Sequence, residues 1–140
     1  MKREKQLNGS AAEVETAFYD ALNRADIDAL MALWADDEEI VCIHPGAPRL
    51  IGHVAIRDSW QTLLAGGGLH IMPTQLHETH NLMSSVHTVI EGVSAVEGRA
   101  AHLLATNVYV KTPRGWRIVL HHASVAPGNA PDDGGAQILH

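Results

Sequence analysis

The residue best suited to chemistry is His44, which ends the short apolar run Ile40-Val41-Cys42-Ile43 and immediately precedes Pro45. A strand should end there, because proline cannot donate a hydrogen bond to an interior ladder. A histidine in that position can face a cavity, and it can gain or lose a proton near neutral pH. We therefore predict that His44 faces a pocket. It is either a general base or a core histidine satisfied by one hydrogen bond.

Two other side chains could complete such a pocket. Asn107 lies in an apolar strand, where an unpaired amide would cost about 1–3 kcal/mol, so we expect a partner, either a ligand or a backbone group. Trp60 could supply a flat wall and an indole donor, or could simply be core. A register slip of one residue would exchange Thr106 for Asn107 at the pocket wall. Tyr109 alternates with Asn107, and we expect it at the surface or an interface.

The neighbours His121 and His122 must face opposite sides of a strand. His121 shares its side with the charged Arg117 if the alternation is regular. We therefore expect His122 to point inward, where it could hydrogen-bond His44 or a ligand oxygen.

Ten histidines raise the question of a metal site. On strands, His77 and His80 would oppose each other, and the chain has no His-x-His or Cys-His pair. A site built from His44, His122 and a third distant residue is the arrangement left open. We expect no metal and no cofactor. The chain also lacks the Gly-x-Ser-x-Gly elbow of a serine hydrolase.

The elements that must position these residues follow from periodicity and turn signals. Ser10 with Glu13 forms a capping box for a first helix to about Asn23, and Asp26 caps a second, shorter helix. Further expected elements are strands at 40–44 and 49–51, a helix carrying Val54 to Leu64, and strands at 69–81, 84–96, 100–111 and 115–125. This order, ααββαββββ, describes an α+β domain.

Length and composition narrow the class of protein. The 140 residues fit one domain, which we place at residues 10–126, between a flexible N-terminus at 1–9 and a mobile tail at 127–140. The net charge of −6 argues against nucleic acid and anionic membranes as partners. No window is apolar enough to span a membrane, and Cys42 reads as a core thiol in a reducing compartment. We expect a cytoplasmic protein.

Four stretches carry a family resemblance: Ala21-Leu22-Asn23-Arg24-Ala25-Asp26-Ile27-Asp28-Ala29-Leu30, Leu33-Trp34-Ala35-Asp36-Asp37, Gly52-His53-Val54-Ala55-Ile56 and Gly115-Trp116-Arg117-Ile118-Val119. Through them the chain resembles the nuclear transport factor 2-like superfamily, which includes ketosteroid isomerase and the SnoaL-like polyketide cyclases, over about residues 10–126. Four further stretches look like a SnoaL-like subgroup: Cys42-Ile43-His44-Pro45, Ser59-Trp60, Thr106-Asn107-Val108-Tyr109-Val110 and His121-His122-Ala123-Ser124. The resemblance implies a cone: a strongly curved, mostly antiparallel sheet wrapped around helices, with an internal pocket and commonly a homodimer across the outer sheet face.

Three ketosteroid isomerase positions can be compared one by one. His44 occupies the position of that enzyme's carboxylate base. Phe18 occupies the position of its oxyanion-donating tyrosine and has no donor, while Tyr19 points about 100° around the helix. Thr106 or Asn107 falls at the position of the protonated aspartate that shares that enzyme's oxyanion hole, and neither residue is an acid. Steroid isomerisation by that constellation is therefore not expected.

Three functional hypotheses follow. In the first, the cone binds a small, mostly apolar or carbonyl-containing molecule, lined by His44, Trp60, Asn107, His122 and Phe18. In the second, the protein is a cofactor-independent isomerase, cyclase or dehydratase in which His44 is the catalytic base. In the third, it is a non-catalytic association domain that dimerises through the outer sheet face.

Overall fold

The computed structural model describes residues 9–96 and 99–126. Three helices and six strands follow in the predicted order: α2 (Ala11–Arg24), α3 (Ile27–Met31), β1 (Val41–Ile43), β2 (Arg49–Ile51), α4 (His53–Leu63), β3 (Ile71–His80), β4 (Ser84–Val96), β5 (Arg99–Thr112) and β6 (Gly115–Val125). The expected flexible N-terminus, apart from Gly9, and the expected mobile tail lie outside the described residues.

The first two helices begin at the predicted caps. Ser10 Oγ accepts a hydrogen bond from the Glu13 backbone N–H at 3.1 Å, and Asp26 Oδ1 accepts one from the Ala29 N–H at 3.1 Å. Each cap satisfies a donor that the first helical turn leaves unpaired. Helix α2 ends where Ala25 takes the left-handed conformation, with φ of 57°. Both predicted helix starts are confirmed.

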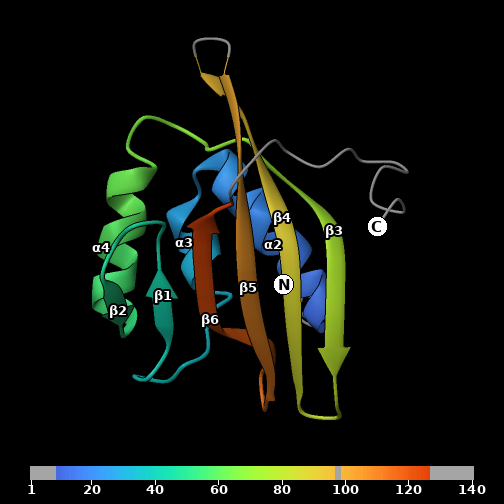
Figure 1. Cartoon of the computed structure of the whole chain (residues 1–140). Coiled ribbons are helices and arrows are strands. Elements are labelled where there is room, and N and C mark those ends of the chain that lie inside the picture. The colour runs from blue at the N-terminus through green and yellow to red at the C-terminus, as the bar shows by residue number, and fades with distance from the viewer. Residues whose placement is uncertain (1–8, 97–98, 127–140) are drawn as a thin grey trace, which may run out of the picture.

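The strands form one sheet in the order β2-β1-β6-β5-β4-β3, in which β1 pairs with β6 in parallel and every other pair is antiparallel. In Figure 1 the strands stand in front of α2 and α3, which cover one face, and α4 stands beside β1 and β2. The predicted α+β cone is confirmed. The core between the sheet and the helices contains Phe18, Leu22, Leu30, Ile56 and Trp60.

An irregularity in the pairing of β5 with β6 decides which side chains enter this interior. Val108 pairs with Leu120, but Tyr109 pairs with Ile118, so Val119 is an extra residue on β6. Such a bulge shifts the alternation of side chains by one position. Asn107 and its partner His121 consequently both face the helices and are 1% and 2% exposed.

Two orientation predictions are wrong, and the bulge explains the first of them. His122 is exposed and His121 is buried, the reverse of the prediction, because the extra residue puts Arg117 and His121 on opposite faces. Tyr109, expected at the surface or an interface, is fully buried, because it lies two positions after Asn107 on β5 and shares its inward face. Asn107 rather than Thr106 faces the interior, since Thr106 pairs with the exposed His122.

No helix within residues 9–96 and 99–126 combines the length and the hydropathy that crossing a bilayer would require.

Candidate functional site

The interior site begins on α2, where one face presents both apolar and polar side chains to the sheet. Glu15, Phe18 and Tyr19 lie three and four positions apart, so they project from one side of the helix. All three are buried, with exposed fractions of 7%, 1% and 3%. Opposite them, strands β4, β5 and β6 contribute buried polar side chains. We call this set the interior network; it consists of Glu15, Tyr19, His87, Glu91, Asn107, Tyr109 and His121.

Hydrogen bonds connect the centre of the interior network. Glu15 Oε2 accepts from Tyr109 Oη at 2.7 Å and from Asn107 Nδ2 at 3.1 Å. Asn107 Nδ2 also donates to Tyr19 Oη at 3.1 Å, and Tyr19 Oη donates to Glu91 Oε2 at 2.6 Å. Asn107 therefore has the partners that its burial requires, and the carboxylates of Glu15 and Glu91 both accept hydrogen bonds from protein donors.

The two buried carboxyl groups have pKa values displaced in opposite directions. Burial alone would raise the pKa of Glu15, but its contacts with His87, Tyr109 and Asn107 outweigh burial and lower it. Burial raises the pKa of Glu91, and the nearby charge of Glu15 raises it further, against the hydrogen bond from Tyr19. The interior thus favours an ionised Glu15 beside a carboxyl group that holds its proton more tightly.

His87 lies at the edge of this arrangement. Its Nδ1 is 3.1 Å from Glu15 Oε1 but is not aligned as a hydrogen bond, while its Nε2 is 3.0 Å from Ser85 Oγ. The side chain is fully buried.

The ionised Glu15 also fixes the tautomer of His121. A carboxylate only accepts, so the amide nitrogen of Asn107 must face Glu15 and its Oδ1 must face His121 Nδ1, 2.6 Å away. Nδ1 therefore carries the hydrogen and Nε2 carries the lone pair. Burial, with smaller contributions from His44 and His122, lowers the pKa of His121 to about 3, so the ring is neutral near pH 7.

His44 is half-buried at the end of β1 and has a defined tautomer as well. Its Nε2 lies 2.9 Å from Ser59 Oγ, and the Ser59 hydroxyl already donates to the Ile56 carbonyl at 2.8 Å. With that hydrogen committed, Nε2 must be the donor, and Nδ1 keeps a lone pair. Burial lowers the pKa of His44, which favours the neutral, basic form.

Trp60 joins the two histidines in what we call the aromatic cluster, formed by Phe18, His44, Trp60 and His121. The Trp60 ring centroid lies 4.6 Å from that of His44 in a T-shaped contact, 5.8 Å from that of His121 and 6.0 Å from that of Phe18. Trp60 is 2% exposed, and its Nε1 has no hydrogen-bond partner among the described residues. The cluster therefore holds two neutral histidines and an unpaired indole donor.

The predicted site residues divide into two groups. Phe18 and His44 each contact Trp60 in the aromatic cluster, and Asn107 is linked to the cluster through His121. His122 lies on the other face of the sheet and does not join them.

Sequence reasoning missed Glu15, Tyr19 and Glu91. The available signal for the two carboxylates was a charged residue beside apolar ones: Glu15 lies between the core positions Val14 and Phe18, and Glu91 directly follows the apolar pair Val89-Ile90. The interior is consequently polar at its centre, whereas a mostly apolar lining was expected.

Cys42 is a core thiol, as predicted. It is fully buried, and burial raises the pKa of the thiol to about 12, which keeps it protonated. Within the described residues, no group of three or more His, Cys, Asp or Glu side chains is arranged to hold a metal ion.

With this curved sheet, its covering helices and the buried polar centre, the chain has the architecture of the nuclear transport factor 2-like superfamily. The SnoaL-like domain family matches residues 12–127, and the chain belongs to that family. No curated protein sequence matches it significantly.

Solved structures similar to the chain carry varied names. A protein from Thiobacillus denitrificans, provisionally named a calcium/calmodulin-dependent protein kinase type II association domain, is 34% identical, with 85% of this chain and 97% of that one covered and a TM-score of 0.78. A provisionally named dehydratase of the NTF2-like family from Streptomyces avermitilis is 29% identical, with 84% and 94% covered and a TM-score of 0.75. An NTF2-like protein with a cystatin-like fold from Novosphingobium aromaticivorans is 19% identical, with 91% and 85% covered and a TM-score of 0.71, and supports the fold alone.

Proposed function

We propose that the protein binds a small molecule whose oxygen, such as a carbonyl, is held by the aromatic cluster. The observation that carries this proposal is the Trp60 Nε1–H, which is buried and unpaired among the described residues. A buried donor without an acceptor costs about 1–3 kcal/mol, and a bound oxygen would remove that cost.

The neighbouring groups suit the same ligand. The lone pairs on His44 Nδ1 and His121 Nε2 can accept from a ligand hydroxyl, while the rings of Phe18 and Trp60 offer apolar surface. The interior network stabilises this arrangement, because the hydrogen bond from His121 Nδ1 to Asn107 Oδ1 holds His121 in one tautomer. A few convergent polar groups beside aromatic walls are typical of small-molecule sites.

A thermal-shift screen with hydrophobic ketones and acyl compounds tests the binding proposal. A ligand at 100 times its dissociation constant should stabilise the protein by about 2.7 kcal/mol. Trp60→Phe keeps an aromatic ring but removes the donor, so the shift should largely disappear. Trp116→Phe is the matched control, because Trp116 is a half-buried tryptophan outside the cluster. Equal shifts in both variants would contradict the role of Trp60, and no shift with any compound would contradict the proposal.

A second candidate function is cofactor-independent proton transfer, as in an isomerase, cyclase or dehydratase. It is favoured by the tautomer of His44, whose Nδ1 lone pair and lowered pKa suit a general base at neutral pH. In this step Nδ1 takes a proton from the carbon next to a carbonyl, and the Trp60 N–H steadies the resulting enolate oxygen. The 29% identical relative that carries the name dehydratase supports the same class of chemistry.

Hydrogen exchange in D₂O tests this step without knowledge of the product. A ketone that binds the protein is incubated with it, and NMR follows replacement of the hydrogens next to the carbonyl by deuterium. His44→Gln keeps a donor for Ser59 but has no base, so exchange should stop while the thermal shift remains. Undiminished exchange in His44→Gln would rule out His44 as the base.

The third hypothesis, an association domain, has support from the 34% identical relative, whose provisional name is that of an association domain. This hypothesis requires that a second copy of the chain covers the outer sheet face. It is compatible with either ligand binding or proton transfer in the interior.

A further inference from the structure

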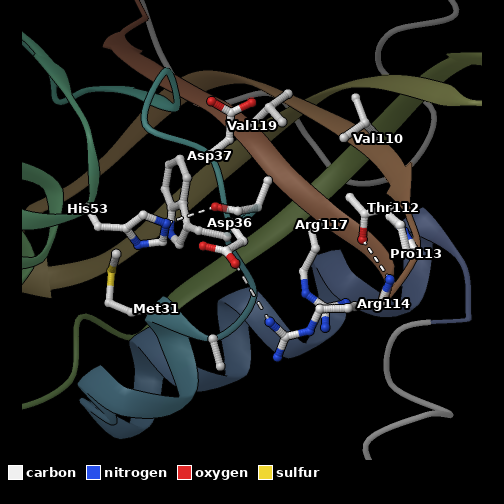
Figure 2. Close-up of a pocket in the computed structure, with 13 residues that line it drawn as sticks. Met31, Asp36, Asp37, His53, Val110, Thr112, Pro113, Arg114, Arg117 and Val119 are labelled. Carbon is white, nitrogen blue, oxygen red and sulfur yellow. Dashed lines mark hydrogen bonds and ion pairs between the residues drawn. The ribbon is translucent and has the colours of Figure 1, made fainter.

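A hollow lies away from the aromatic cluster, between the segment from Met31 to Asp37 and the β5–β6 hairpin. This outer groove has a volume of about 590 Å³, and its lining includes Met31, Trp34, His53, Val110, Arg114 and Arg117. Figure 2 shows the arginines of the β5–β6 hairpin on one side of the groove, and Met31 and His53 on the other. The volume is in the usual range for a small-molecule site.

The hairpin side of the outer groove is cationic. The Arg117 side chain is anchored by a hydrogen bond from Nη1 to the Trp116 carbonyl at 2.9 Å. Arg114 Nη1 lies 3.9 Å from Asp36 Oδ2, and both side chains are largely exposed, at 73% and 88%. An ion pair of that length and exposure contributes little, so an incoming anion can displace it.

The other side of the groove is formed by Met31 and His53, and His53 Nε2 donates to the Ala35 carbonyl at 2.8 Å. Val110 lies on the hairpin side, where it pairs with Arg117 and adds apolar surface. Asp36 and Asp37 also line the groove, so a second negative charge on the ligand would be repelled.

An independent observation points to a ligand at the groove. Trp34, which lines the outer groove, is 3% exposed, and its Nε1 has no hydrogen-bond partner among the described residues. Its position is fixed because the Leu33 carbonyl and the Ala35 N–H on either side of it are both bonded to Ile118. The Trp34 side chain is therefore held at the groove, and its indole donor has no acceptor among the described residues.

We propose that the outer groove is a second binding site, separate from the aromatic cluster, for a small monocarboxylate with a compact apolar body. The carboxylate pairs with Arg117 and Arg114, whose planar guanidinium groups suit two-oxygen anions. The apolar body lies against Met31, Trp34 and Val110, and a ligand oxygen supplies the acceptor that Trp34 lacks. Asp36 competes with the ligand for Arg114 and so lowers the affinity of the groove for the ligand.

The three tryptophans provide a direct test, because each gives one indole N–H signal in a ¹H–¹⁵N NMR spectrum. Phenylacetate is the probe, and neutral phenylacetamide is its matched control. We expect phenylacetate to move the Trp34 signal, assigned with Trp34→Phe, in a saturable way, and phenylacetamide to move it far less. The Trp60 signal reports the aromatic cluster separately, so failure at one site is distinguishable from failure at the other.

Charge variants give effects of opposite sign. Arg114→Gln, a substitution at an exposed position, should weaken phenylacetate binding by about tenfold, the loss expected for one charge-assisted hydrogen bond. Asp36→Asn should tighten binding by up to about fivefold, because it removes the competing ion pair.

Any of the following results would overturn the proposal: no movement of the Trp34 signal at millimolar phenylacetate, equal movement with the amide, or unchanged affinity in both charge variants. A Trp34 signal that shifts with protein concentration alone would also overturn it, since it would show that a second copy of the chain occupies the groove.

Discussion

At the scale of single residues, the interior network is organised by one ionised group. Glu15 accepts from Tyr109 and Asn107, and the resulting orientation of Asn107 determines which nitrogen of His121 carries hydrogen. His121 thereby presents a lone pair with no freedom to switch tautomer. A buried group of this kind leaves a signature in the pH dependence of stability.

His121 should make the protein more stable as pH rises from about 5 to about 6.5. Its pKa is about 3 in the folded protein, against 6.5 for an ordinary histidine, so between these values the unfolded chain binds the extra proton. Stability is therefore lost as pH falls through this window, with a slope approaching about 1.4 kcal/mol per pH unit for one histidine. Urea denaturation at several pH values measures this slope.

The variant His121→Gln isolates this contribution, because its amide can still donate to Asn107. His44, whose pKa is also lowered, adds a slope of the same sign, whereas Glu91, whose pKa is raised, opposes it. The slope of the unfolding free energy against pH should therefore be smaller in His121→Gln, by most of the slope that one bound proton contributes. An identical slope in the variant and the wild type would mean that His121 is not buried in neutral form.

At the scale of elements, the connection from α4 to β3 is fastened to the end of α2. The Asn23 side chain both accepts from the Ile71 N–H at 2.7 Å and donates to the Ile71 carbonyl at 2.9 Å. Gly68 passes so close to Asn23 that an added Cβ would lie 2.6 Å from its carbonyl carbon and closer still to its oxygen. This close approach positions the start of β3 and hence the edge of the sheet.

Gly68→Ala should destabilise the fold by about 1–3 kcal/mol, because the obstruction is backbone and cannot rotate away. Gly66→Ala is the matched control in the same segment, since its Cβ would meet nothing within 4 Å. That control should change stability by less than about 0.5 kcal/mol. Urea denaturation midpoints of the two variants test this prediction. Equal midpoints would show that the connection is not held against α2.

At the scale of the whole molecule, the sheet face opposite α2 carries a row of apolar side chains. Val86 pairs with Val108, and Val108 pairs with Leu120, so the row crosses β4, β5 and β6. Val86 is 40% exposed and Leu104, on the same face, is 46% exposed. We propose that a second copy of the chain covers this face as a homodimer, since exposed apolar patches commonly mark interfaces.

Val108→Lys should dissociate such a dimer, because it places two charges at the centre of a two-fold interface. Sedimentation equilibrium should report a change from two chains to one, with circular dichroism unchanged. Val54→Lys alters a 77% exposed side chain on α4 and should leave the assembly intact. A wild-type protein that sediments as a monomer at all concentrations would contradict the proposed dimer.

The order and limits of most elements could be predicted from the sequence because they depend on local signals. Ser10 and Asp26 cap helices through bonds to residues three positions away, and Pro45 ends a strand by its own chemistry. Predicted strands 49–51, 84–96 and 115–125 coincide with β2, β4 and β6, since turn residues bound them. The family resemblance supplied the cone that joins these elements.

The sequence by itself also identified His44, Trp60 and Phe18 as neighbours of a common interior. The prediction that His122 rather than His121 points inward was wrong, because that choice depends on the bulge at Val119, and the bulge exists only where β6 pairs with β5. The sequence could not show that Glu15, Glu91 and Asn107, separated by up to 92 positions, share one buried centre. Local chemistry determined the elements, whereas strand pairing and packing decided which side chains meet, because both depend on contacts between distant parts of the chain.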